Sequence, residues 1–239
     1  LQVRNVLGEP QISADVQGRD FVLGGVQLGN YTLAGSASAT EARVDAFHAA
    51  LGDTAVSLRF GAAFTDSVKR ILIEALDINL EGTRWSLANE VPLRVGAGHF
   101  AMSDMRLSSS QGAVSGAGVF QRGVQVSGGL QFEHFDLGLL NPFVESQEPL
   151  AGMLTADLAA GGDPDEPTIS LVGNLVDAPF AMARVDSLLV EAQYKAGTVK
   201  FRELDLLSEF GRVKGAGSVS NPGASLEDYW PGADLDLEL

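Results

Sequence analysis

The sequence has no cysteine, few basic residues and no long hydrophobic run. Without cysteine the chain forms no disulfide bond and offers no thiolate, which suits a periplasmic or a cytosolic location equally well. Lysine and arginine total 16 against 31 acidic residues, so the net charge is −15. We therefore expect no nucleic-acid partner, because the basic surface needed for one is lacking, and anionic lipid headgroups would be repelled by the outer surface.

The lack of long apolar runs bears on membranes and targeting. No stretch approaches the ~18 consecutive apolar residues of a membrane span, and no basic segment followed by an apolar one opens the chain as in a signal peptide. The first six residues already have the pattern of a strand. We therefore expect residues 1–239 to form a single continuous, repetitive β-sheet segment of a longer protein.

The chain contains many stretches in which apolar and polar residues alternate. Apolar and polar residues alternate over residues 56–60, 169–175 and 188–194, and hydrophobic residues make up 45% of the chain. Successive side chains of a strand point to opposite faces, so this pattern builds a sheet with one apolar and one polar face. Turn signals interrupt it every ~8–12 residues. The pattern predicts an all-β fold: a long, curled, groove-like sheet of repeated strands with an apolar interior and one or two short helices.

Three stretches also fit a helix. In residues 40–52 apolar side chains recur at helical spacing between Thr40, a residue type that caps helices, and Gly52, a residue type that ends them. Residues 66–80 fit a helix and a bulged strand equally well. Residues 136–144 suit a short helix capped by Asp136. We expect strands for the first two stretches and a short helix for the third.

One segment of the sequence occurs twice. Residues 91–120 recur as residues 190–219, with Leu107 matching Leu206 at an offset of 206 − 107 = 99. The glycine-rich part of the first copy lacks the Lys-Ser/Thr ending of a phosphate-binding loop. Glycines inside strands mark bends or close backbone approach, so we expect them to curve the sheet.

No group of residues predicts catalysis or metal binding. The three histidines (His48, His99 and His134) stand apart from one another and from any carboxylate cluster, so they are best explained as polar or half-buried strand residues. The acidic residues 161–167 contain two prolines, which favour a stiff turn over a calcium loop. We expect no enzyme activity, no cofactor and no metal.

The apolar face of such a sheet must be covered, by a second sheet, by closure into a barrel, or by curling into a groove. A repeat that continues beyond both ends disfavours closure. The natural guest of an apolar groove is a hydrocarbon chain, because each buried CH₂ contributes about 0.8 kcal/mol. The residues expected to line the groove are Val56, Leu58, Phe60, Phe100, Met102, Val124, Val126, Leu130, Phe132, Leu154, Leu158, Ile169, Leu171, Leu175, Leu188, Val190, Tyr194, Val199 and Phe201.

Glycine, leucine and proline positions from about Gly8 to the end carry a family resemblance. They lie in residues 85–87, 100–116, 135–140, 150–154, 166–170, 194, 204–206 and 215–219. In their order they resemble the middle periplasmic segment of the TamB and AsmA-like family, which comprises the inner-membrane subunit of the translocation and assembly module and bridge-like lipid-transfer proteins. The resemblance implies a taco-shaped β-sheet, open along one side, with a hydrophobic interior.

The same resemblance implies a role in the cell envelope. Members are anchored in the inner membrane of diderm bacteria, cross the periplasm and are implicated in moving phospholipids to the outer membrane. TamB also works with an outer-membrane BamA-like partner in outer-membrane biogenesis. Residues 1–239 match neither the membrane anchor nor a partner-docking end, so partner binding would lie in parts outside this chain.

We therefore expect a non-enzymatic periplasmic lipid conduit that shields phospholipid acyl chains. Two alternatives stay open. A structural or adhesive β-repeat protein would pack its apolar faces into a dry core and bind no ligand. A carbohydrate-active β-domain would need carboxylates and aromatic side chains converging on one cleft.

Overall fold

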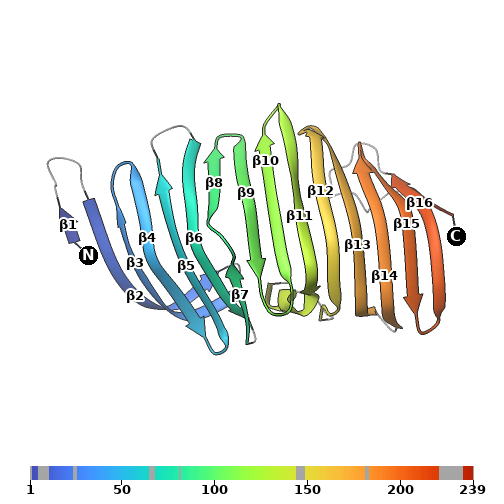
Figure 1. Ribbon diagram of the computed structural model, residues 1–239, viewed down its shortest axis with the longest axis horizontal. Coiled ribbons are helices and arrows are strands. Elements are labelled where there is room, and N and C mark those ends of the chain that lie inside the picture. Colours follow the sequence, from blue (N-terminus) through green and yellow to red (C-terminus); the bar gives the residue numbers. More distant parts are fainter. Residues whose placement is uncertain are drawn as a thin grey trace. The chain divides into compact units, whose positions relative to one another are not determined.

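The computed structural model describes residues 2–4, 11–23, 26–64, 68–80, 82–143, 149–180, 183–220 and 234–238, and nearly all of them lie in antiparallel strands (Figure 1). The predicted all-β fold, a long antiparallel sheet, is confirmed. Contacts divide the chain into two compact units. Unit 1 comprises Leu1–Gln111 with Ser115–Ala117, and unit 2 comprises Gly112–Val114 with Gly118–Leu239.

Unit 1 is an antiparallel meander. Its strands are β1 (Gln2–Arg4), β2 (Gln11–Leu23), β3 (Val26–Ala37), β4 (Glu41–Leu51), β5 (Thr54–Ala63), β6 (Val68–Leu80), β7 (Thr83–Leu87), β8 (Val91–Gly96) and β9 (His99–Ser108). From β2 to β6 each strand pairs with the next one in the chain. The short β7 and β8 pair with successive parts of β6, and β9 pairs with both.

Unit 2 is a second meander. Its strands are β11 (Gln125–Asp136), β12 (Met153–Asp163), β13 (Glu166–Phe180), β14 (Ala183–Lys195), β15 (Thr198–Ser208), β16 (Gly211–Ser220) and β17 (Asp234–Glu238), while β10 (Ala113–Gln121) is divided between the units. Every strand from β11 onward pairs with its successor in the chain. Both units therefore use the simplest antiparallel connectivity.

Bulges keep apolar residues on one face where the alternation breaks. In β4, Val44 pairs with Phe60 and Phe47 pairs with Leu58, so Val44 and Phe47 share a face although they are three residues apart. One extra residue restores the period-two alternation and bends the strand. The same shift separates Ile73 from Leu76 in β6, Phe132 from Phe135 in β11, and Phe201 from Leu204 in β15.

These bulges explain the helix-like spacing in the sequence. Residues 40–52 contain strand β4, and the described part of the second ambiguous stretch, residues 68–80, is the bulged strand β6. Both strand predictions are confirmed. A bulge places two same-face residues three apart, which is also the spacing of neighbours on one helix face.

The third ambiguous stretch is a short helix, as predicted. A 3₁₀-helix, η1 (Leu137–Phe143), follows β11, and the backbone N–H of Gly138 donates to Asp136 Oδ1 at 2.8 Å. The side chain of Asn141 then holds Leu150, accepting from its N–H at 2.6 Å and donating to its carbonyl at 3.0 Å. These bonds fasten the connection between β11 and β12.

The sequence repeat coincides with the strands. β9 and β10 fall in the first copy, and β15 and β16 fall in the second. In each copy one strand, β9 or β15, starts directly after a turn whose glycine has a positive φ, 68° at Gly98 and 70° at Gly197. Both copies also break the alternation at matching positions, because Asp104 in β9 has a φ of 44° and β15 has its bulge after Phe201.

Candidate apolar binding face

In unit 2 the register aligns apolar residues into rows across one face of the sheet. One row, through Leu158, contains Leu130, Leu158, Leu171, Ala192, Phe201 and Gly217. Another row, through Leu154, contains Phe135, Leu154, Leu175, Leu188, Leu206 and Val213, and the row between the two contains Phe132, Ala156, Gly173, Val190, Leu204 and Gly215. We call the side of the sheet that carries these rows the apolar face of unit 2.

Unit 1 has an equivalent face. One row contains Leu33, Phe47, Leu58 and Leu76, and a second contains Gly35, Val44, Phe60, Ile73 and Val91. A third row contains Ala37, Ala42, Ala62, Ile71, Leu93 and Met102. We call this side the apolar face of unit 1.

The predicted lining residues fall on these two faces, with one exception. Unit 1 carries Val56, Leu58, Phe60, Phe100 and Met102. Unit 2 carries Val126, Leu130, Phe132, Leu154, Leu158, Ile169, Leu171, Leu175, Leu188, Val190, Tyr194, Val199 and Phe201. Val124 was expected on a strand and instead lies in the turn before β11, where it is 60% exposed, because β11 begins only at Gln125.

Sequence alternation missed residues that lie beyond a bulge. Phe47, Leu76, Phe135 and Leu204 lie on the apolar faces although simple alternation assigns them to the opposite face. The signal that could have found them is a pair of apolar residues three apart inside an otherwise alternating strand.

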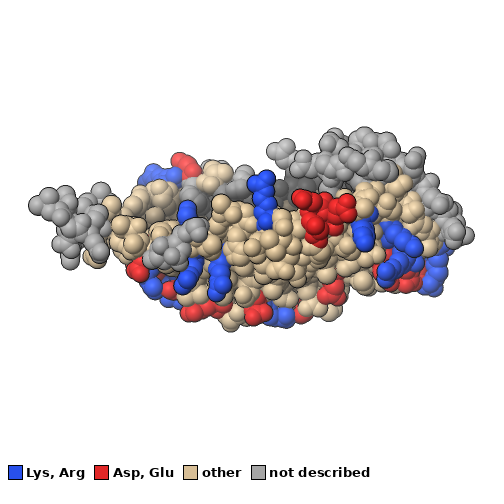
Figure 2. Space-filling view, turned by 90° about the horizontal axis from the view of Figure 1, so that it is seen from above, with Lys and Arg blue, Asp and Glu red and all other residues tan. Residues whose placement is uncertain are grey.

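The rows contain no charged residue, whereas the opposite face carries ion pairs. Arg43 Nη2 lies 3.0 Å from Glu74 Oε2, and Arg202 Nη1 lies 3.1 Å from Glu191 Oε1. Figure 2 shows Lys, Arg, Asp and Glu side chains along the lower margin of the view and further groups of them elsewhere. In each unit we call the side of the sheet that carries these ion pairs, opposite the apolar rows, the polar face. Lys69, which pairs with Val95, lies on the apolar side of unit 1.

Two carboxylates of the polar face are held strongly ionised. At Asp77 the Ser86 hydroxyl, which donates at 2.6 Å, lowers the carboxyl pKa, and Arg84 adds to this effect. The pKa of Asp205 is lowered further, chiefly by hydrogen bonds from Arg212 and then from Lys214. At both sites the carboxylate is paired with side chains of the next strand in the chain, β7 for Asp77 and β16 for Asp205.

The apolar faces are only partly covered. Among the residues that the structure describes, ten apolar side chains are buried, five of them alanines, and Val91 is the most completely buried large one at 1% exposure. Most row residues are half-buried, and Phe100 remains 40% exposed. A two-sheet core would bury such side chains almost completely. No second layer of described residues therefore covers these faces.

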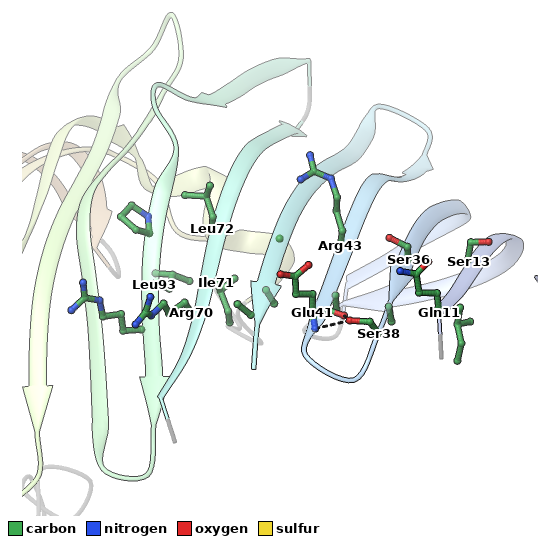
Figure 3. A pocket seen from close by; sticks show the side chains of 18 residues that line it. Gln11, Ser13, Ser36, Ser38, Glu41, Arg43, Arg70, Ile71, Leu72 and Leu93 are labelled. Atoms are coloured by element: carbon green, nitrogen blue, oxygen red, sulfur yellow. Dashed lines mark hydrogen bonds between the residues drawn. The ribbon is translucent and has the colours of Figure 1, made fainter. Parts of the chain in front are cut away.

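Unit 1 also contains a trough of about 780 Å³ that crosses six strands (Figure 3). Five of the strands contribute three consecutive residues each, and β3 contributes Ser36 and Ala37 with Ser38 just beyond its end. The walls therefore combine side chains from alternate positions with intervening backbone. Its lining includes Glu41, Arg43, Arg70, Leu72 and Arg94. At Gly61, in the middle of the trough, an added Cβ would meet no atom within 4 Å.

Other kinds of site find no support in the described ranges. No group of three or more His, Asp or Glu side chains there has the arrangement of a metal site. His48 Nδ1 lies 2.9 Å from Ser57 Oγ on the polar face, as expected for a polar strand residue. None of the helices among the described residues has the length and apolarity needed to span a membrane.

Together these features define a class of protein: an antiparallel all-β sheet with apolar rows that contain no charged residue and that no second layer of described residues covers. Comparison with protein-family models, with curated proteins and with solved structures finds no match to this chain.

Proposed function

We propose that this chain is a segment of a lipid conduit whose apolar faces shield phospholipid acyl chains. The observation that carries the proposal is the uninterrupted, charge-free set of apolar rows on a face left half-exposed by the described residues. Leaving such a surface in water is unfavourable, and contiguous exposed apolar area marks an interaction site. An acyl chain lying across the rows would contribute about 0.8 kcal/mol for each CH₂ it buries.

The apolar rows suit an acyl chain that moves along the sheet and is not held at one position. Within unit 2 the rows present leucine, valine and phenylalanine side chains without a hydrogen-bonding group to fix a ligand in one position. Dispersion and hydrophobic contacts are non-directional, so an acyl chain would move along the rows at little cost. No chemistry is needed, in keeping with a conduit that is not an enzyme.

The setting of this function follows the sequence resemblance to the TamB and AsmA-like family. The proposal places the chain in the periplasm, as part of a protein anchored in the inner membrane, with a role in outer-membrane biogenesis. Contact with a BamA-like partner would belong to other parts of the full-length protein.

The alternative of a structural or adhesive repeat protein predicts a dry core. Such a core requires many large side chains with almost no exposure, whereas half of the buried apolar residues described here are alanines. The half-exposed rows favour a face with an exchangeable guest over one packed permanently within the chain.

Photocrosslinking tests the proposal. A photoreactive amino acid at Phe132 or Leu171, on the apolar face, is expected to capture phospholipid when the purified chain is incubated with vesicles. The matched controls are Gln131 and Ser170, the preceding residues of the same strands, which point to the polar face. Equal capture at the two pairs of positions, or no lipid on the protein by native mass spectrometry, would contradict a conduit.

A further inference from the structure

The polar face of unit 2 carries large apolar side chains among its charges. Val172 of β13 pairs with Glu191 and Leu207 of β15 pairs with Arg212, so both belong to this face. They are 48% and 41% exposed. Leu189 of β14 lies between them, one diagonal step from each across the strand pairs. Diagonal neighbours lie within reach of long side chains, so the three form an oblique stripe.

Two further residues widen this stripe. Val176 is a diagonal neighbour of Leu189 and pairs directly with Met153. We call these five residues, Met153, Val172, Val176, Leu189 and Leu207, the polar-face patch. The patch crosses the neighbouring strands β12 to β15 (Figure 1) and extends along β13 from Val172 to Val176, about 14 Å in each direction. Exposed apolar surface with a polar rim marks a site of interaction.

The sequence repeat shows that the sheet itself does not require apolar residues there. Leu207 corresponds to Ser108 of β9, since 207 − 99 = 108. Phe210, which is strongly exposed in the turn after β15, corresponds to Gln111. The first copy thus forms the corresponding strand and connection with polar residues at both places. The water-facing leucine and phenylalanine of the second copy therefore have a role other than building the sheet.

The size of the polar-face patch favours a short peptide segment over a second folded domain. Its dimensions give an area of about 200 Å². A stable interface between folded proteins buries about 800 Å² on each partner. A second copy of this chain is also disfavoured by charge, because two chains of net charge −15 repel each other.

Charge favours a basic segment. Val172 lies between two carboxylates, because its direct partners are Asp157 on β12 and Glu191 on β14. Arg202 lies 3.1 Å from Glu191, whereas no cation of the described residues forms an ion pair with Asp157. A lysine or arginine placed over Val172 would lay its aliphatic stem on the patch and bring its cation to Asp157. The negative potential of the chain would attract the same partner from a distance.

We propose that the polar-face patch binds a short segment of another protein, in which apolar side chains are flanked by lysine or arginine. This surface lies opposite the apolar face of unit 2. The proposal is therefore independent of the lipid conduit, and its failure would leave the conduit unaffected.

Selection from a peptide library tests the chemistry of the partner. Random peptides of about seven residues, long enough to cross the patch when extended, are displayed on phage. They are depleted on the variant V172T/L207T, in which threonine keeps a strand-favouring side chain, and are then selected on the parent. Peptides that combine apolar residues with lysine or arginine are expected to be enriched. No enrichment on the parent overturns the docking surface, and enrichment of acidic peptides overturns a basic partner.

The affinity of one selected peptide, synthesised with a fluorescent label, tests the residues of the patch. V172T/L207T is expected to raise its Kd about tenfold in fluorescence anisotropy. D157N leaves the apolar side chains in place and should raise the Kd about threefold, with a smaller effect at high salt. The control V22T/L51T removes exposed apolar surface from unit 1 and should change the Kd by less than about twofold. An equal loss in the control and in V172T/L207T overturns the site.

Two further measurements test other occupants of the patch. Dimerisation seen by analytical ultracentrifugation and lost in V172T/L207T would assign the patch to a second copy of this chain and overturn the proposal. Flotation with phosphatidylcholine vesicles that is lost in the same variant would assign it to a membrane surface and also overturn the proposal. A monomer that floats equally well with and without the two substitutions supports the peptide partner.

Discussion

The two copies of the sequence repeat differ in which of their residues are retained. Residues identical in both copies at positions of the apolar face include Leu107/Leu206, Val114/Val213, Gly116/Gly215 and Gly118/Gly217. On the polar face Ala117 matches Ala216, but the charged positions diverge. Asp205, Arg212 and Lys214 form an ion cluster in the second copy, and the matching residues of the first copy are Arg106, Ala113 and Ser115.

The comparison teaches that a repeat of this kind specifies a surface and its bends, while the water-facing charges vary. The apolar position after each bulge is retained in kind, with Met105 in the first copy and Leu204 in the second. A charged residue on the polar face needs only local partners, and the two copies find different ones. An apolar row must align with its neighbours in every strand, so it tolerates little change.

The largest effect on stability is expected from deleting the bulge residue in either copy of the repeat. Removing Arg202 from β15 is expected to turn Leu204 and Leu206 to the polar face and to lower the free energy of unfolding by about 3 kcal/mol. Deleting Ser103, its equivalent at 202 − 99 = 103, should cost a similar amount. The urea unfolding midpoint measures both.

The control for these deletions changes chain length without changing the register of a strand. One glycine inserted after Phe210, which is 79% exposed between β15 and β16, should leave the midpoint within about 0.5 kcal/mol of the parent. A deletion of Arg202 as mild as this insertion would show that the alternation beyond the bulge carries no stability.

The next largest effect is expected at two matching glycines, Gly112 just before β10 and Gly211 at the start of β16. A Cβ at Gly112 would collide with the backbone carbonyls of Glu133 and His134, so Gly112→Ala is expected to cost about 3 kcal/mol. Gly211 has open space but a φ of 135°, so Gly211→Ala should cost about 1 kcal/mol through backbone strain alone. Differential scanning calorimetry of both variants checks whether Gly112→Ala lowers the melting temperature more than Gly211→Ala does.

Gly61→Ala supplies the matched control. Gly61 has neither a close neighbour nor a positive φ, so alanine should change the unfolding free energy by no more than about 0.5 kcal/mol. If Gly112→Ala were as harmless as this control, the close approach of the Gly112 backbone to β11 would have no energetic consequence.

The ion cluster of the second copy gives the smallest effect, which depends on pH. The pKa of Asp205 is lowered in the folded protein, so its ionised form contributes stability above the unfolded carboxyl pKa of about 3.9. That contribution is lost as the pH falls through the lower folded value. Asp205→Asn should therefore be less stable than the parent at pH 7, with the gap closing as acid is added.

Urea unfolding at neutral and acidic pH measures this gap. Asp15→Asn, a change at an exposed carboxylate of β2, controls for the loss of one negative charge. A gap between parent and Asp205→Asn that stayed constant into strong acid would exclude ionisation of Asp205 as the source of its stability. The double variant Arg106→Asp with Ala113→Arg would test whether the first copy of the repeat can form the same ion pair.

Much of the fold was predictable because alternation is a local signal. Residues 169–175 and 188–194 alternate cleanly, and β13 and β14 pair Leu171 with Ala192 in the register that alternation requires. The short helix after β11 was equally accessible, since Asp136 forms the expected cap. These features depend on few residues close in sequence.

The candidate site was harder to predict, because its members lie across bulges and strands. The assignment of Phe135 to the row of Leu154 depends on a bulge whose position no single strand reveals. Val124 continues the alternation of the strand in sequence, yet it lies in the turn before β11. The pairing of Arg70 with Arg94 depends on β8 lying against β6 rather than following β7 in simple order. Such facts depend on long-range register, which alternation leaves open.

The sequential pairing of unit 2 has a consequence for how the chain is made. Each strand from β11 to β16 hydrogen-bonds to the one that follows it, so a new hairpin can close as soon as its second strand is available. Such a sheet grows by addition at its edge, and its stability accumulates strand by strand as in other repeat proteins. A polypeptide that emerges amino terminus first can therefore begin to fold before its carboxyl-terminal strands are available.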